Sequence, residues 1–255
     1  MNIGIIGEGV VGQAIHRGFK KQGHRVLVHD IKYGTSSSIL LETDIIYICV
    51  PTNSAEDGSC DTSIVEQTLQ ELTNLGYKGI VAIKSTIIPG TFTMLESIFD
   101  KNRLCHVPEF LREKYAYEDF VENHNVLIIG TNNTECETTV KKCHGDLPKS
   151  VYVVTPSEAE FVKYFSNVFK AYKTVFANSF GKLCDSFNVD YSTVLKAYEY
   201  QNVKETDYLH YAKELGGFGG MCLPKDTKAL AKLVADKNLK IDTFEFIINE
   251  NRKHI

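Results

Sequence analysis

A glycine-rich turn directly follows the first apolar run of the chain, and it constrains the fold more than any other feature. Residues 2–6 are typical of a buried strand, and the G-x-G-x-x-G spacing over residues 7–12 then opens a helix-compatible segment. In this pattern the first glycine permits a tight turn, the second lets backbone approach a pyrophosphate at the helix N-terminus, and the third allows close helix packing. The residues assigned to a dinucleotide by this turn are Gly7, Gly9, Val10, Val11 and Gly12.

An acidic residue ends the next predicted strand. Asp30 lies about 20 positions beyond the glycines, where dinucleotide-binding folds place the carboxylate that binds the ribose hydroxyls. Asp30 would repel a 2'-phosphate, so NAD is predicted as the cofactor. Lys32 is assigned to the same site, and its positive charge keeps NADP as an alternative. A glycine turn that serves packing alone is the other reading, and the agreement of strand, spacing and acid disfavours it.

Short β-rich runs alternate with helix-compatible stretches through residue 155. Several runs are almost entirely apolar, as a sheet covered on both faces requires. The predicted strands are Asn2–Ile6, Arg25–His29, Asp44–Cys49, Gly79–Ile83, Arg103–Val107, Asn125–Ile129 and Ser150–Val154. Residues 1–155 are therefore predicted to form a doubly wound α/β domain of the Rossmann type, which binds NAD.

The pattern changes after residue 155. Ser157 and Glu160 have the spacing of a capping box, and apolar residues at helical intervals then predict one long helix packed on both sides. Further helices are expected near residues 190–200, 204–214, 225–238 and 242–253. Residues 156–255 are thus predicted to be an all-α domain with a long central helix.

Composition excludes several classes of protein. The 43% hydrophobic and 24% charged content is that of a globular chain, and a net charge of -4 disfavours nucleic-acid or anionic-membrane binding. We find no secretory signal and no apolar run of about 20 residues. The seven cysteines form no C-x-x-C pair, which predicts free thiols in a reducing cytoplasm. No metal site is predicted, because the Cys105-His106 and Cys143-His144 doublets lack a spaced second pair.

One cysteine has the surroundings of a nucleophile. Cys222 follows a glycine-rich loop that allows close ligand approach, and Lys225 and Asp226 open the next helix. Cationic neighbours and a helix N-terminus favour the thiolate. The other six cysteines are interpreted as small buried hydrophobes. On the long helix, Lys163 and Asn167 are four residues apart and project from one face, although such a lysine is ordinarily a solvated charge.

Five segments together resemble the UDP-glucose/GDP-mannose dehydrogenase family over almost the whole chain. They are ICVPTNSAEDGSCDTSIV (48–65), KSTIIPGT (84–91), VPEFLRE (107–113), SEAEFVKYFSN (157–167) and GGFGGMCLPKD (216–226). The resemblance implies oxidation of a nucleotide sugar's primary alcohol to a carboxylate with two NAD, through a thiohemiacetal and a thioester on Cys222. It also implies a homodimer formed through the helical domain. A short form without the family's C-terminal nucleotide-binding domain is expected, and a separate chain could supply that domain.

The resemblance assigns a role to individual residues. Lys163 and Asn167 would stabilise an alkoxide, Thr86 and Asp226 would hold a water, and Glu109 would assist thioester hydrolysis. The glycine turn, Asp30 and Lys32 are expected at the cofactor. The resemblance adds six further residues there: Val50, Pro51, Thr52, Ser85, Thr86 and Glu113. Expected at the substrate are Phe110, Leu111, Arg112, Lys163, Asn167, Phe218, Gly219, Gly220 and Lys225.

Two other functions remain open from the sequence. A two-electron β-hydroxyacid dehydrogenase would have about this length and a helix-borne lysine and asparagine, but it leaves the segment at 216–226 without a purpose. The other alternative is a chain without catalysis of its own, either a non-catalytic NAD-binding subunit or half of a split enzyme.

Overall fold

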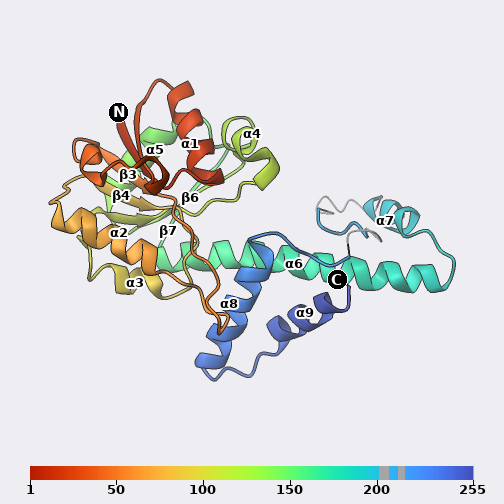
Figure 1. The fold of residues 1–255 in the computed structure, drawn as a ribbon. Coiled ribbons are helices and arrows are strands. Elements are labelled where there is room, and N and C mark those ends of the chain that lie inside the picture. The colour runs from red at the N-terminus through yellow and green to blue at the C-terminus, as the bar shows by residue number, and fades with distance from the viewer. Residues whose placement is uncertain (201–206, 212–215, 255) are drawn as a thin grey trace. The chain divides into compact units, whose positions relative to one another are not determined.

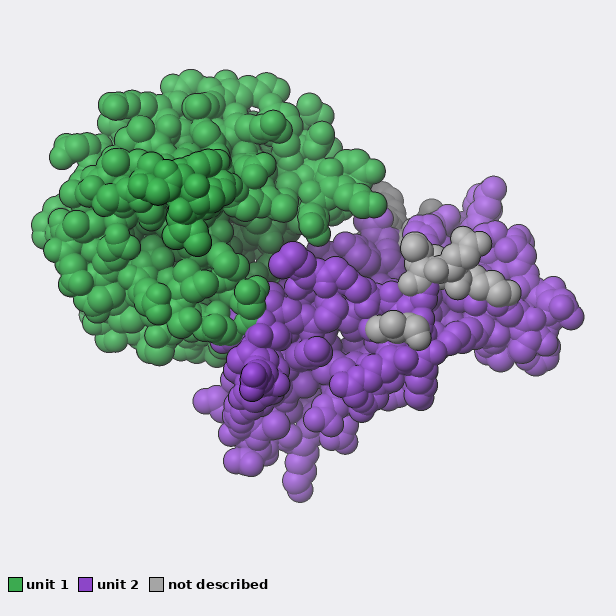
Figure 2. Space-filling view, in the orientation of Figure 1, with its two compact units in different colours: residues 1–53, 61–163 green, residues 54–60, 164–255 purple. Residues whose placement is uncertain are grey.

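The computed structural model describes residues 1–200, 207–211 and 216–254. The chain divides into two compact units, coloured separately in Figure 2: unit 1 comprises residues 1–53 and 61–163, and unit 2 comprises residues 54–60 and 164–255. Each unit is described by itself below. The domain boundary at residue 155 remains a prediction, because the long helix that follows it belongs to both units.

Unit 1 is built on a seven-stranded sheet of order β2-β1-β3-β4-β5-β6-β7 (Figure 1). Neighbouring strands are parallel except for β5 and β6, which are antiparallel. The strands are β1 (Asn2–Ile6), β2 (Arg25–His29), β3 (Ile45–Ile48), β4 (Ile80–Ile83), β5 (Leu104–His106), β6 (Leu127–Gly130) and β7 (Val151–Val154). All seven predicted strands are confirmed, with ends that differ by no more than two residues.

Helices cover both faces of this sheet, as a doubly wound fold requires. Because side chains alternate along a strand, Ile45 and Tyr47 pack in one apolar cluster while Ile46 and Ile48 pack in the other. The first cluster includes side chains of α1 (Val10–Lys21) and α5 (Thr134–His144), together with Phe120 of α4 (Ala116–Val121). The second includes α2 (Ser63–Asn74) and α3 (Thr91–Leu95). Four short 3-10 helices are η1 (Ile31–Tyr33), η2 (Ser37–Leu40), η3 (Lys101–Arg103) and η4 (Glu113–Tyr115).

The long predicted helix, α6, spans Pro156–Ser186, but its start differs from the prediction. The Thr155 N–H donates to Glu158 Oε2 over 2.7 Å, and the Glu158 N–H donates to Thr155 Oγ1 over 3.3 Å. The capping box is therefore Thr155 with Glu158, and the predicted Ser157–Glu160 box is wrong. Proline is favoured at the first helical position, which places the cap at the residue before it.

Unit 2 consists of helices around a small apolar core. It contains most of α6, α7 (Tyr191–Glu199), α8 (Leu223–Asp236) and α9 (Thr243–Arg252). Val168, Val175, Phe218 and Ile247 form the centre of its core. The helix expected near 204–214 is wrong for residues 207–211, which are turn and irregular backbone, and its other residues lie outside the described ranges. No described helix is long and apolar enough to cross a membrane.

Histidines are buried in the core of unit 1. His106 and His144 have no exposed surface, and His124 is 9% exposed. The His144 ring packs edge-on against Phe19, with centroids 5.2 Å apart, and lies 5.6 Å from the His124 ring. Burial lowers the pKa of His106 to about 3 and that of His124 to about 4, and it holds the pKa of His144 well below its usual value. All three imidazoles are therefore neutral in the folded protein at pH 7.

Stability should depend steeply on pH below 6.5. The unfolded chain takes up protons at these histidines near pH 6.5 while the folded chain does not, so the free energy of unfolding falls as pH drops from 6.5 toward 4. Three such groups contribute a slope of about 4 kcal/mol per pH unit. Urea unfolding at a series of pH values measures it, and His144→Phe should reduce the slope by about a third. An unchanged slope in that variant would contradict the assignment.

Candidate active site

The parallel strands of unit 1 bring the predicted cofactor segments to one edge of the sheet. Because β1, β3, β4 and β5 are parallel neighbours, their carboxyl ends meet at the same edge, which is where open α/β sheets bind ligands. The segments that leave these four ends are residues 7–12, 50–52, 84–86 and 107–113. Segments far apart in sequence are therefore gathered by topology.

The glycine turn has the backbone geometry that its spacing predicts. Gly7 has φ +89°, and a Cβ there would lie 2.8 Å from the Cys49 carbonyl oxygen. A Cβ at Gly12 would lie 2.0 Å from the Gly7 carbonyl oxygen, so only glycine fits where α1 leaves the turn. No atom lies within 4 Å of the place that a Cβ on Gly9 would take. The turn thus leaves open space at the N-terminus of α1.

Asp30 is tied to this turn at the end of β2. Its Oδ2 accepts the Glu8 N–H over 2.6 Å, and its Oδ1 accepts the Lys32 N–H over 3.0 Å. Burial opposes ionisation, but these N–H groups and the Lys32 ammonium outweigh it and hold the pKa of Asp30 below its usual value. The carboxylate keeps further lone pairs for a ligand.

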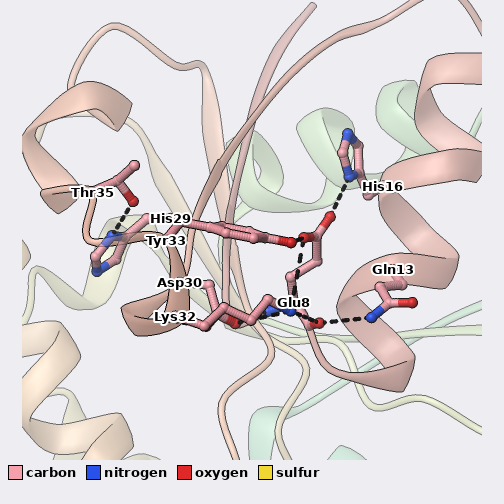
Figure 3. Close-up of polar contacts among 8 residues, drawn as sticks. All are labelled: Glu8, Gln13, His16, His29, Asp30, Lys32, Tyr33 and Thr35. Carbon is pink, nitrogen blue, oxygen red and sulfur yellow. Dashed lines mark hydrogen bonds and ion pairs between the residues drawn. The ribbon is translucent and has the colours of Figure 1, made fainter.

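Glu8, between the first two glycines, was given no role by the sequence. Its residue is 8% exposed, and its carboxylate accepts hydrogen bonds from the Tyr33 hydroxyl and, over 2.6 Å, from His16 Nδ1 (Figure 3). The signal that could have revealed it is a charged residue at a position next to a predicted phosphate site.

The segments after β3 and β4 are joined by hydrogen bonds. Thr52 Oγ1 donates to the Thr86 carbonyl over 2.7 Å, and Ser85 Oγ donates to the Val50 carbonyl over 2.7 Å. Thr52 and Ser85 are buried, whereas Thr86 is half-buried. These four residues and the exposed Pro51 therefore belong to one connected edge, and their roles at a cofactor remain predictions.

A buried ion pair joins the segment after β5 to α6. Lys163 Nζ lies 3.0 Å from Glu109 Oε1 and donates to the Glu109 carbonyl over 2.6 Å. The other carboxylate oxygen of Glu109 accepts the Leu111 N–H over 2.7 Å, and the Phe110 ring centroid lies 5.5 Å from Lys163 Nζ. Burial raises the pKa of Glu109, but Lys163, the Leu111 N–H and Lys84 more than offset this, so its pKa is lowered. Glu109 is ionised and can accept a proton.

A second buried lysine lies nearby and was missed from the sequence. Lys84 is 4% exposed and donates to the Val107 carbonyl over 3.2 Å. Burial lowers the pKa of Lys84, against the attraction of Cys49 and Glu109. A lysine that directly follows the apolar strand β4 is the signal that could have identified it.

Two predicted ligand residues have other surroundings in unit 1. The Arg112 guanidinium forms a fork on Asp119, with Nη2 to Oδ1 at 2.6 Å and Nε to Oδ2 at 2.9 Å. It also lies 5.0 Å from the Tyr115 ring centroid. Glu113 is exposed at the start of η4. Their roles at a substrate or cofactor remain predictions.

In unit 2, a buried carboxylate in the first turn of α8 connects three predicted residues. Asp226 is 1% exposed; its Oδ2 accepts from Asn167 Nδ2 and its Oδ1 from Lys225 Nζ, each over 2.6 Å. Asn167 lies one turn beyond Lys163 on α6, so the predicted spacing on one helix is confirmed.

The glycine-rich loop before α8 is held by two asparagines that the sequence analysis did not identify. Asn251 accepts the Phe218 N–H over 2.7 Å and donates to the Phe218 carbonyl over 3.0 Å, while Asn178 donates to the Gly216 carbonyl over 2.8 Å. Phe218 is buried in the core of unit 2, and the next residues, Gly219 and Gly220, are exposed. The loop therefore has a fixed base and an open end.

Cys222 lies at that open end, at the N-cap of α8. It is the exposed member of the seven free cysteines; Cys49 and Cys60 are half-buried and the other four are buried. The thiol is thus accessible directly before a helix N-terminus, where backbone N–H groups favour an anion.

The structure groups the predicted residues by unit. In unit 1 it gathers the glycine turn, Asp30, the edge residues after β3 and β4, and the Glu109–Lys163 pair. In unit 2 it gathers Asn167, Lys225, Asp226 and the Cys222 loop. The first group can hold a dinucleotide and move a proton, and the second offers a nucleophile beside amide and carboxylate groups.

Known proteins share this sequence and this fold. The chain is 31% identical to a UDP-glucose 6-dehydrogenase of Bacillus subtilis over 85% of this chain and 48% of that protein. The chain spans about half the length of the curated relatives it matches. A UDP-glucose dehydrogenase from Pyrobaculum islandicum superposes with a TM-score of 0.89 at 27% identity, over 99% of this chain and 68% of that one. A 3-hydroxyisobutyrate dehydrogenase of Mycobacterium tuberculosis, at 11% identity and a TM-score of 0.74 over 99% of this chain and 92% of that one, shares the fold alone.

Two family models match successive parts of the chain. Residues 32–147 match the NAD binding domain of the UDP-glucose/GDP-mannose dehydrogenase family, and residues 157–253 match its central domain. Together with the glycine turn and the Cys222 loop, these matches establish that the chain belongs to the UDP-glucose/GDP-mannose dehydrogenase family.

Proposed function

We propose that this chain takes part in NAD-dependent oxidation of a nucleotide sugar's primary alcohol to the carboxylate. The proposal is supported by the family matches, by the relatives named UDP-glucose dehydrogenases, and by the chemistry of the two residue groups. The observation that carries it is an exposed Cys222 before α8, four residues from a buried Asp226 that Asn167 and Lys225 bind.

The residues of unit 1 fit an NAD molecule. The open space over Gly9 leaves room for a pyrophosphate at the N-terminus of α1, and the ionised Asp30 has lone pairs for ribose hydroxyls. Val50, Thr52 and Ser85 continue the same sheet edge. When bound, NAD would supply the acceptor for the two hydrides that an alcohol-to-acid oxidation releases.

For the alcohol-to-aldehyde step, Lys163 and Asn167 would stabilise negative charge on the substrate oxygen. An ammonium and an amide N–H favour an alkoxide more strongly than an alcohol, which lowers the barrier to its formation. Asp226, which is already bound to Asn167, would take part in removing the alcohol proton through a water.

For the aldehyde-to-acid step, Cys222 would add to the aldehyde carbon. A C–S bond forms and the carbonyl oxygen takes a proton, which gives a thiohemiacetal. This would become a thioester by losing its carbon-bound hydrogen as a hydride to a second NAD and its hydroxyl proton to a base. Water then forms a C–O bond as the C–S bond breaks, the Cys222 thiolate leaves, and the ionised Glu109 accepts the proton of the attacking water. Covalent capture would keep the aldehyde from escaping.

A two-electron β-hydroxyacid dehydrogenase is the second candidate. Its support is the fold shared with the 3-hydroxyisobutyrate dehydrogenase, a match that covers 92% of that chain. A two-electron mechanism assigns no role to the exposed thiol of Cys222. A reducing cytoplasm, which suits seven free cysteines, remains our expectation for either candidate.

Cys222→Ser should abolish acid formation while the Kd for NAD stays within about twofold, because a serine alkoxide is a poor leaving group for hydrolysis. NADH production and acid are measured with UDP-glucose and GDP-mannose, and native thiol labelling confirms that the fast-reacting thiol is gone. Unchanged steady-state NADH production in this variant would refute the covalent route and favour the two-electron alternative.

Lys163→Ala should lower kcat more than it raises KM, since the ammonium interacts most strongly with the charge of the transition state. It should also cost about 3–5 kcal/mol of stability, because Glu109 is left buried and unpaired. The double variant Lys163→Met/Glu109→Gln removes both charges and should recover most of the stability without recovering kcat. A change in KM alone, or recovery of kcat in the double variant, would contradict the catalytic role.

We also propose that a second copy of the chain covers an exposed apolar stripe on α6. The stripe repeats at intervals of three and four residues, so it lies along one side of the helix. It consists of Phe165, Phe169, Tyr172, Phe176 and Phe180, which are between 39% and 74% exposed. Aromatic surface of this extent on a described helix is typical of an interface.

Phe165→Asp/Phe176→Asp should convert a dimer to a monomer in sedimentation velocity, because the dimer would have to bury four carboxylates. Phe187→Asp is the matched control, since Phe187 is 73% exposed but lies beyond the end of α6. The account of this interface is wrong if the wild-type chain is a monomer at micromolar concentration, or if the control dissociates as the stripe variant does.

A further inference from the structure

Three oxygen acceptors and one aromatic ring, from the glycine turn and the segment after β2, lie around the ammonium of Lys32. Lys32 Nζ donates to the Glu8 carbonyl over 2.8 Å, lies 4.0 Å from Glu8 Oε2 and 3.9 Å from Asp30 Oδ2, and lies 4.9 Å from the Tyr33 ring centroid. Figure 3 shows these side chains converging between the turn and the end of β2. The ammonium thus has two carboxylates, a carbonyl oxygen and an aromatic ring around it.

Without these partners, the Lys32 ammonium would favour binding of NADP over NAD. A 2'-phosphate on the adenine ribose requires a cationic partner near the acidic residue that ends β2. Lys32 lies two residues after Asp30, a position from which its ammonium could bind the 2'-phosphate. Its ammonium lies within 4.0 Å of the Glu8 and Asp30 carboxylates, and the three side chains together carry a net charge of about -1.

Hydrogen bonds hold Glu8 in the position from which it contacts the Lys32 ammonium. Its N–H is bound by Asp30, its carbonyl also accepts from Gln13 Nε2 over 3.1 Å, and its carboxylate is bound by His16 and Tyr33. Burial disfavours its charge, but the hydrogen bonds from Tyr33 and His16 and the charge of Lys32 lower its pKa, so it is ionised at pH 7.

We propose that Glu8 is a specificity-determining residue that rejects 2'-phosphorylated dinucleotides, by adding a second carboxylate beside Asp30 and by binding the Lys32 ammonium. The inference rests on the proposed binding of NAD in unit 1 and adds a residue that the glycine spacing leaves unspecified. The role is electrostatic, so it should respond to charge and to salt rather than to the shape of the side chain.

Glu8→Gln tests the role, because glutamine keeps the size and an acceptor for Tyr33 while removing the charge. Calorimetric titration of the purified 255-residue chain with NAD and with NADP at pH 7.5 gives the ratio of the two Kd values. We expect the variant to shift this ratio toward NADP by roughly tenfold at low salt, because it removes one negative charge beside the site of the 2'-phosphate. The shift should shrink at about 0.5 M salt.

Tyr33→Phe is the matched control, because it removes a hydrogen bond to Glu8 and leaves both carboxylates in place. Its ratio should stay within about twofold of the wild-type value. An equal shift in Tyr33→Phe and Glu8→Gln would show that packing of the turn, not charge, sets the preference, and would overturn the proposal. The proposal would also be overturned if Glu8→Gln left the ratio of the two Kd values unchanged, or if the shift in that ratio persisted at high salt.

Lys32→Met gives an independent measurement if Glu8→Gln fails to fold. In the wild-type background it should change NADP affinity less than about twofold, because the ammonium already donates to the Glu8 carbonyl and lies beside two carboxylates. A loss of roughly tenfold would mean that Lys32 is available to a phosphate, which contradicts the proposal. A wild-type chain that binds neither dinucleotide would overturn the proposed NAD binding itself, a result distinct from all of these.

Discussion

Two buried ionisable side chains on the first turns of α6, Glu160 and Lys163, fix this helix against the functional segments of unit 1, although burial raises the pKa of Glu160 to about 7. Glu160 has no exposed surface and accepts the N–H groups of Gly90 and Phe92 over 2.8 and 2.7 Å, while Lys163 is 3% exposed and pairs with Glu109. A shift of the helix by one residue would leave the Glu160 carboxyl without its hydrogen bonds and the Lys163 ammonium without its carboxylate, and a buried polar or charged group without a partner is costly. The helix is therefore anchored to the segments that follow β4 and β5, and Lys163 is held at the same sheet edge as the glycine turn.

The same helix connects this edge to the chemistry of unit 2 through its own periodicity. Asn167 lies one turn after Lys163 and binds Asp226, which opens α8 four residues after Cys222. A proton acceptor, an ammonium, an amide and an accessible thiol are the groups that an alcohol-to-acid oxidation requires. The fold alone would serve a simpler dehydrogenase equally well, so the functional assignment depends on these side chains and on the family match.

The sequence predicted the inner strands of unit 1 closely because they are buried and almost entirely apolar, whereas the edge strands β2 and β7 are partly or mostly exposed and were recognised by their β-branched residues. It predicted α6 because apolar residues recur at helical spacing, but it placed the capping box two residues late. Both Thr155–Glu158 and Ser157–Glu160 have the right spacing, and only the proline at position 156 and the buried partners of Glu160 distinguish them. Contacts such as Glu109 with Lys163, Lys84 with Val107, or Glu8 with Tyr33 join elements far apart in the chain. Their pairing depends on strand order and helix packing, which local patterns do not contain.

We propose a four-electron oxidation that passes through Cys222. The most direct test is the amount of NADH formed per molecule of acid, measured anaerobically with the purified chain over a panel of UDP- and GDP-sugars. We expect two NADH for each carboxylate and no free aldehyde, because both oxidations occur before release. One NADH for each oxidised product, or aldehyde that accumulates in solution, would contradict it.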